Sequence, residues 1–178
     1  MSKVYTSAVV IIPPEEIWAP IQEIRKTYDR NIDRWMPHIT LLYPFRPVTK
    51  YSEIEKTFAL ECSKFKSFSI SLKLFNYFHH GNQNYTIWID PKPNDPIINL
   101  QANLLQIVSD CDDVNRFKGG YKPHLSLGQI KRKSKVVDIL KELQENWKEL
   151  KFLIKSIFFI SRGESKSSKF EISKEIEF

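Results

Sequence analysis

The sequence predicts an α+β fold, built as one bilobal domain over residues 1–178. Three observations predict it. Strand-like and helical segments follow one another in the order βαβαββαβαββ, the motif Pro-His-aliphatic-hydroxyl-Leu occurs at residues 37–41 and again at 123–127, and no linker or low-complexity stretch divides the chain. With 42% hydrophobic residues, the 178-residue chain can bury one full-sized core. We expect two mixed or antiparallel sheets that face a central cleft, with the helices packed outside.

The first predicted elements are a strand and the helix that follows it. Val4 to Ile12 is a nearly continuous apolar run with β-branched residues, which is typical of a strand buried on both faces. The segment Pro13-Pro14-Glu15-Glu16 supplies N-terminal prolines and first-turn acids, and apolar residues then repeat at helical spacing up to Asp29. These features predict a helix over residues 13–29.

The later elements follow from the same two periodicities. Residues 68–74 alternate between apolar and polar side chains, which predicts a half-buried strand, and the turn residues at 79–82 predict that residues 84–89 return as its antiparallel partner. The other predicted strands are residues 38–43, 124–130, 151–160 and 169–178, and the other predicted helices are residues 51–64, 95–108 and 134–147.

Charge and cysteine content narrow the class of function. Lysine and arginine number 27 against 21 acids, and the net charge of +6 favours an anionic partner such as nucleic acid, nucleotide or phosphate, although a basic surface that only aids solubility fits the same charge. Cys62 and Cys111 lie far apart and outside any Cys/His ligand spacing, so we expect reduced structural thiols. The first apolar run ends at Pro13, too early to span a membrane, and we expect a cytoplasmic protein, with nuclear entry left open.

The repeated motif carries the chemistry. From average residue usage, one such pentapeptide arises by chance in about one chain in two thousand of this size, so two indicate an internal duplication. Because side chains alternate along a strand, His38 and Thr40 share one face, as do His124 and Ser126. Two lobes related by a twofold axis would bring these four side chains to a shared cleft, around a site of phosphate size.

Other residues are expected to assist these four. Metal binding is a competing use of two imidazoles, but no third His, Cys or carboxylate lies near either motif in the sequence, so we expect no metal site and no cofactor. Arg34, Trp35, Tyr121 and Lys122 flank the motifs and combine aromatic rings with cations, which suits contacts to a nucleotide substrate. Tyr121 lies at an odd offset from His124, so a core position fits it equally.

Two further segments have less specific patterns. Residues 131–135, Lys-Arg-Lys-Ser-Lys, fit either a nucleic-acid patch or a solvated loop at a helix start. His79 and His80 fit an exposed hairpin turn, which could touch a long substrate if it lies near the rim of the cleft.

The two motifs, His38-Ile39-Thr40 and His124-Leu125-Ser126, resemble those of the 2H phosphoesterases, the superfamily of bacterial and archaeal 2'-5' RNA ligases and cyclic phosphodiesterases. Arg34-Trp35 also looks like the Arg-Trp found upstream of the first motif in the RNA-ligase-like branch, whereas Gln129 stands where that branch commonly has Arg. The resemblance covers essentially the whole chain. It implies a bilobal fold and metal-free phosphodiester cleavage, in which the two histidines act as general acid and general base while the two hydroxyls hold phosphate oxygens.

The function expected from the sequence is therefore that of a monomeric, metal-independent phosphodiesterase for RNA or nucleotides, which opens a 2',3'-cyclic phosphate. One alternative keeps the chemistry and changes the substrate to a 2'-5' oligoadenylate, a cyclic dinucleotide or an RNA 3' end. The other alternative is a non-catalytic RNA-binding module whose histidines only recognise phosphate.

Overall fold

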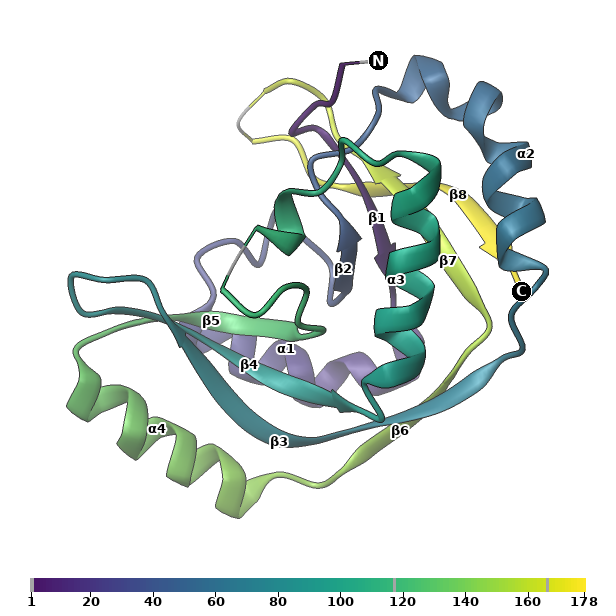
Figure 1. The fold of residues 1–178 in the computed structure, drawn as a ribbon. Helices are drawn as coiled ribbons and strands as arrows, with labels where there is room; N and C mark the ends of the chain where they lie inside the picture. The colour runs from purple at the N-terminus through teal and green to yellow at the C-terminus, as the bar shows by residue number, and fades with distance from the viewer. Residues whose placement is uncertain (1, 117, 166) are drawn as a thin grey trace.

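The computed structural model describes residues 2–116, 118–165 and 167–178. These residues form an α+β fold with one eight-stranded antiparallel sheet, in the order β6-β3-β4-β5-β2-β1-β7-β8 (Figure 1). The strands are β1 (Ser7–Ile11), β2 (Ile39–Leu42), β3 (Phe68–His79), β4 (Asn84–Lys92), β5 (Leu125–Lys131), β6 (Leu150–Ile154), β7 (Ser156–Ser161) and β8 (Glu171–Glu177). The α-helices are α1 (Trp18–Tyr28), α2 (Tyr51–Cys62), α3 (Asp95–Ile107) and α4 (Lys133–Asn146), and short 3-10 turns cover Glu15–Ile17, Val48–Lys50 and Asp113–Asn115.

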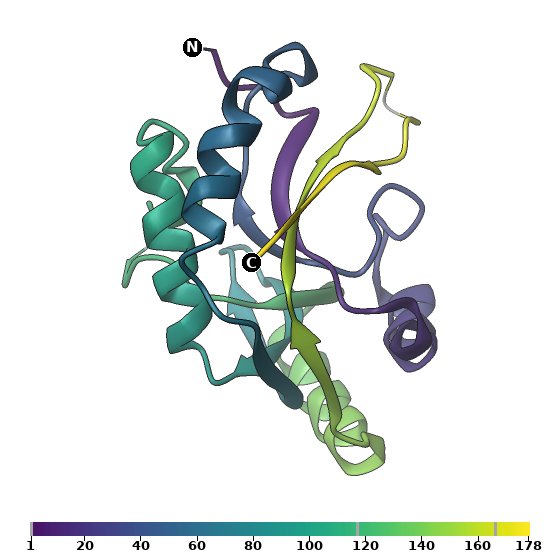
Figure 2. The ribbon, with the colours of Figure 1, turned by 90° about the vertical axis from the view of Figure 1, so that its right-hand side faces the viewer.

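The order of elements agrees with the sequence prediction except at residues 151–160, and the expectation of two sheets is wrong. The predicted strand over residues 151–160 is in fact β6 and β7, which are separated by Lys155 alone (Figure 2). Six strand spacings of about 4.8 Å would hold these two strands roughly 29 Å apart in a flat sheet. Since one residue joins them, the sheet has to curl until its two ends come close together. A single curled sheet therefore takes the place of two facing sheets.

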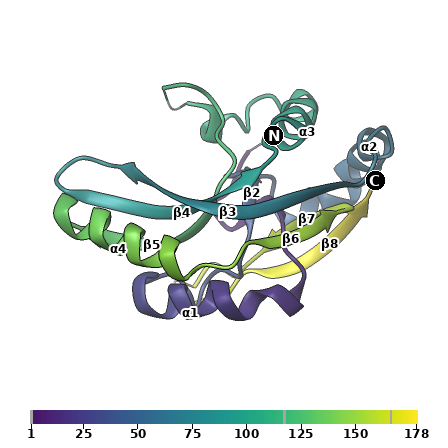
Figure 3. The same cartoon turned by 90° about the horizontal axis from the view of Figure 1, so that it is seen from below.

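The two halves of the sheet have equivalent strand orders. Strands β8, β7, β1 and β2 lie in the upper half of Figure 1 and β6, β3, β4 and β5 in the lower half, and the halves meet where β2 pairs with β5. Figure 3 shows α2 and α3 on one side of the molecule and α1 and α4 on the opposite side. Helix α1 follows β1 but packs on β5 of the other half, and α3 follows β4 but contacts β2. This exchange of helices gives both lobes one shared core.

The faces of the strands follow the predicted alternation with two exceptions. All of β1 is buried, as its apolar run predicts: Val9 and Ile11 join the main core, and Ala8 and Val10 join a smaller cluster on the opposite face. Leu74 ends the predicted alternating segment and Ile172 lies in the predicted strand over residues 169–178. Both side chains are exposed, because bulges in β3 and in the β7–β8 pair change the register beside them. Within the described ranges, no helix is long and apolar enough to cross a membrane.

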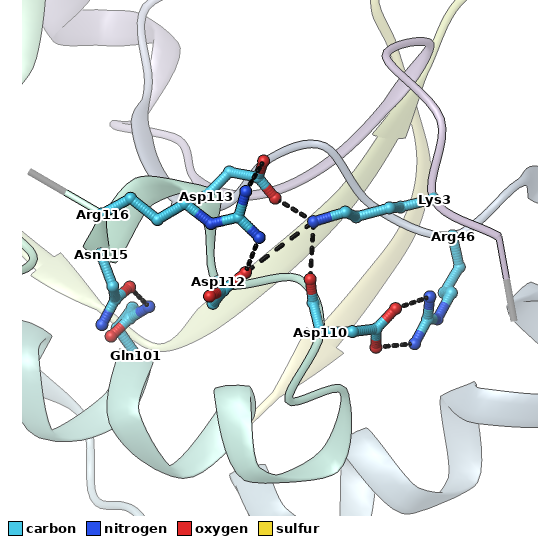
Figure 4. A network of polar contacts seen from close by, with 8 residues as sticks. All are labelled: Lys3, Arg46, Gln101, Asp110, Asp112, Asp113, Asn115 and Arg116. Atoms are coloured by element: carbon cyan, nitrogen blue, oxygen red, sulfur yellow. Dashed lines mark hydrogen bonds and ion pairs between the residues drawn. The ribbon is translucent and has the colours of Figure 1, made fainter.

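Ion pairs hold the loop that leads from α3 to the second motif (Figure 4). The Lys3 ammonium contacts the Asp113 carboxylate and donates to the Asp110 carbonyl oxygen at 2.7 Å. The buried Arg46 guanidinium binds the Asp110 carboxylate through both terminal nitrogens. These contacts fasten the loop to the N-terminal segment and to the chain after β2, next to the first motif.

Gly128 is required where the end of α1 lies against β5. A Cβ atom at this position would lie 2.4 Å from Cβ and 2.6 Å from the carbonyl oxygen of Tyr28. We expect Gly128→Ala to lower the free energy of unfolding by about 1–3 kcal/mol, because backbone has to move, and to lower the Tm by about 2–12 °C. Thermal unfolding tests this prediction with Gly163→Ala as the control, since Gly163 lies outside the left-handed region and a Cβ there meets the movable end of the Ser168 side chain, with the hydroxyl oxygen at 2.9 Å. Equal losses in the two variants would rule out the contact with Tyr28 as the cause.

Candidate active site

The four side chains of the repeated motif come together on one face of the sheet, at the junction of the lobes. Ile39 on β2 and Leu125 on β5 are Cα partners, and both side chains are fully buried in the main core. One residue to either side, the same antiparallel register sets His38 opposite Ser126 and Thr40 opposite His124. Directly opposed residues have Cβ atoms about 5 Å apart, and diagonal ones about 7–8 Å. Each histidine is therefore paired with the hydroxyl of the other motif, and the two imidazoles lie diagonally across the same square.

Both imidazoles are oriented by the same hydrogen bond. The Nδ1 atom of His38 lies 2.7 Å from the Met36 carbonyl oxygen, and that of His124 lies 2.7 Å from the Lys122 carbonyl oxygen. A carbonyl oxygen can only accept, so Nδ1 carries the proton in each ring and Nε2 is left to exchange protons. A buried proline between acceptor and histidine limits the backbone freedom of both segments. The proline of each motif thus helps to set the tautomer.

Burial lowers the pKa of both histidines. The pKa of His38 falls to about 4, chiefly by desolvation, with further lowering by the charges of Arg25 and His124. Desolvation and the charge of Lys122 lower the pKa of His124. Both rings are therefore neutral in the free protein at pH 7, and each has a lone pair on Nε2. Protonating one ring makes it harder to protonate the other, as expected for two bases that share one site.

Aromatic side chains hold the two imidazoles in different ways. The Trp35 ring stacks on His38 with centroids 4.8 Å apart, and its other face stacks on Phe170 at 3.7 Å. The His124 ring instead meets Phe78 edge to face at 4.9 Å. Phe78 in turn stacks on the buried Trp88 at 4.9 Å. Neither Phe78 nor Trp88 was predicted as a site residue, because only the pairing of Trp88 with Ser126 sets Trp88 on the face of the site.

The four predicted substrate contacts have different surroundings. Lys122 is exposed beside His124, with its Nζ atom 4.8 Å from the centre of the Trp88 ring. Arg34 lines a hollow of about 540 Å³ next to Trp35, whose two ring faces are already covered. Tyr121 packs against the main core and donates its hydroxyl proton to the Thr40 carbonyl oxygen at 2.8 Å, and burial raises its pKa. The side chains of Lys122 and Arg34 are therefore accessible, whereas the Trp35 ring stacks on His38 and Phe170 and the Tyr121 hydroxyl is hydrogen-bonded to the backbone of β2.

A buried ion pair connects α1 to the site. Arg25 and Asp29, with side chains 2% and 5% exposed, are joined by Nε and Nη2 contacts of 2.9 Å. Arg25 also donates to the Trp35 carbonyl oxygen at 2.7 Å, and Asp29 accepts from the Gln129 amide at 3.2 Å. The pair thus contacts both the backbone of Trp35, which stacks on His38, and Gln129, which lies on the same strand as Ser126. Neither Arg25 nor Asp29 was predicted as a site residue from the sequence, because an Arg and an Asp four residues apart on a helix usually form a surface pair.

Comparison with known proteins identifies the family. A family model described as the 2'-5' RNA ligase superfamily matches residues 13–166. The chain belongs to the 2'-5' RNA ligase superfamily. This confirms the resemblance to the 2H phosphoesterases that the two motifs indicated. No curated protein matches the sequence.

Solved structures of two other proteins share the fold over nearly the whole chain. TT0787 of Thermus thermophilus has a TM-score of 0.62 at 13% identity, with 97% of each chain covered. E. coli LigT has a TM-score of 0.59 in complex with 3'-AMP and 0.60 in complex with NADP+, in both cases at 14% identity with 99% of each chain covered. At these identities the likeness is one of fold alone.

Proposed function

We propose that this member of the 2'-5' RNA ligase superfamily is a metal-independent phosphodiesterase for RNA or nucleotides, and that it opens 2',3'-cyclic phosphates. It acts as a monomer, and residues 1–178 form one bilobal domain. The observation that carries the proposal is the β2–β5 register, because it sets two imidazoles and two hydroxyls around one point. The complexes of E. coli LigT with 3'-AMP and ATP support a nucleotide as the substrate.

The proposed reaction uses the two Nε2 atoms as base and acid. The neutral imidazole removes a proton from water, and the water oxygen attacks phosphorus. The bond from phosphorus to the 2' or 3' oxygen breaks, and that oxygen takes the proton from Nε2 of the protonated imidazole. Thr40 and Ser126 donate hydrogen bonds to the non-bridging oxygens, where negative charge builds up. The arrangement is symmetric, so either His38 or His124 can serve as the base, according to how the substrate lies.

Product analysis in EDTA tests the proposal. The panel contains 2',3'-cyclic nucleotides, RNA that ends in a cyclic phosphate, 2'-5' oligoadenylate, RNA with a free 3' end, and cyclic dinucleotides. We expect the cyclic phosphates to open at rates that EDTA does not change. If only another compound of the panel is turned over, the two-histidine reaction stands and that compound replaces the cyclic phosphate as the proposed substrate. Tight RNA binding without turnover of any compound would favour the RNA-binding module instead.

The pH dependence follows from the lowered pKa values. Catalysis needs one imidazole protonated and the other neutral, a state most populated between the two pKa values of the pair. Burial holds both values below the usual 6.5. We therefore expect a bell-shaped profile of kcat/KM with its maximum below pH 6.5, because the base is lost on the acid side and the acid on the alkaline side. The kcat profile should lie at higher pH, since bound phosphate favours the protonated ring.

Initial rates between about pH 4 and pH 9 test this expectation. A rate that rises steadily from about pH 5 to pH 9 would contradict acid and base catalysis by two histidines of lowered pKa.

A further inference from the structure

A second polar hollow lies beside the candidate active site, at the ends of β4 and β5. Its volume is about 490 Å³. The side chains that could meet a ligand there include Arg30, His80, Asn84, Thr86, Gln129 and Lys131. Lys131 belongs to the basic run over residues 131–135, and His80 belongs to the hairpin turn. The proposed reaction assigns no role to either segment.

This hollow is continuous with the site along the sheet. Trp88 on β4 is the Cα partner of Ser126, and Thr86, two residues away on β4, is the partner of Gln129. Residues two apart on a strand share a face, about 7 Å from each other. Gln129 is three positions after Ser126, so a regular strand would place the two side chains on opposite faces. A bulge in this strand pair returns Gln129, and with it Lys131, to the face of Ser126.

The charge of the hollow suits a phosphate. In the described part of the chain, Arg30 and Lys131 have exposed side chains that make no ion pair. The Gln129 side chain accepts from the Arg30 backbone N–H at 3.3 Å, which places the Arg30 residue beside β5. The Nε2 atom of His80 is hydrogen-bonded to the Thr86 hydroxyl oxygen at 2.9 Å. One acid acts nearby, since Glu142 on α4 adds to the effect of burial in raising the pKa of Tyr28.

We propose that the hollow of Arg30 and Lys131 binds the phosphodiester one nucleotide away from the reacting phosphate, so that the preferred substrate is an RNA oligonucleotide and not a mononucleotide. The inference rests on the proposed function. The Thr86–Gln129 pair lies about 7 Å along the sheet from the Trp88–Ser126 pair, a distance similar to the length of one nucleotide in extended single-stranded RNA. The Arg30 backbone lies beside Gln129 at this distance, and Lys131 lies about 7 Å further along β5. Their two long cationic side chains provide the sequence-independent contacts to the backbone that single-stranded nucleic acid needs.

The test compares two substrates that carry the same reacting group: adenosine 2',3'-cyclic phosphate and the trinucleotide ApApA with a 2',3'-cyclic phosphate end. The variant is Arg30→Gln with Lys131→Gln, and the control is Lys141→Gln with Lys148→Gln, two exposed lysines outside the hollow. We expect the ratio of kcat/KM for trimer over monomer to fall at least about tenfold in the variant, with a shallower salt dependence for the trimer. The control should keep the wild-type ratio.

Binding measured in parallel separates this inference from the proposed function. A fluorescent ApApA with a 3'-phosphate end gives the Kd by anisotropy, whether or not turnover occurs. If the wild type turns over neither compound, the proposed function fails, and a Kd raised about tenfold in the variant alone still supports the hollow as a phosphate site. A trimer-to-monomer ratio unchanged by the variant, an equal Kd in wild type and variant, or no measurable binding would overturn the inference.

Discussion

Replacing either His38 or His124 by alanine is expected to lower kcat for the cyclic phosphate by about 10²- to 10⁴-fold, the contribution typical of one general acid or base. Each ring presents only Nε2 for proton exchange, since its Nδ1 is engaged by a backbone carbonyl oxygen. Because the two rings act in one step, the kcat of the double variant should be only slightly lower than that of the less active single variant. Single-turnover kinetics measures the chemical step directly.

His79→Ala is the matched control for these variants. His79 is an exposed histidine on β3 whose ring stacks on Tyr85 at 4.8 Å, outside the square of motif residues. It should keep wild-type kcat. A kcat within about tenfold of wild type in His38→Ala or in His124→Ala would contradict the assignment. The circular dichroism spectrum has to show that each variant is folded.

Arg25→Ala is expected to cause the largest loss of stability among single substitutions near the site. It leaves the buried Asp29 carboxylate without its ion partner and removes the donor to the Trp35 carbonyl oxygen. Breaking a buried pair in this way costs about 3–5 kcal/mol, which lowers the Tm of a domain of this size by roughly 6–20 °C. Thermal unfolding followed by circular dichroism measures the change.

The neighbouring residue supplies the control for Arg25. Lys26 pairs with Glu23 on the surface of the same helix, where both side chains are more than 60% exposed. Because such a pair contributes about 0–1 kcal/mol, Lys26→Ala should change the Tm by at most about 4 °C. An Arg25→Ala variant as stable as Lys26→Ala would show that the buried pair does not hold α1 to the site.

Much of the fold could be predicted from local patterns. The apolar run of β1, the alternation in β3 and the helical spacing in α1 are determined by neighbouring residues, so the order of elements followed from the sequence. The bulges beside Leu74 and Ile172 could not be predicted, because a bulge depends on how one strand pairs with another. The same holds for the Arg25–Asp29 pair, whose burial comes from β5 and the loop before β2.

The sequence by itself determined the candidate residues: two copies of one motif, each with a histidine and a hydroxyl on the same strand face and a proline before the histidine. Only the tertiary structure decided how they combine. The single residue Lys155 joins β6, at one end of the sheet order, to β7, next to the other end, which makes one curled sheet out of the two sheets expected. The β2–β5 register then sets each histidine against the hydroxyl of the other motif. Pairing between segments 86 residues apart depends on the packing of the whole chain, and local periodicity carries no information about it.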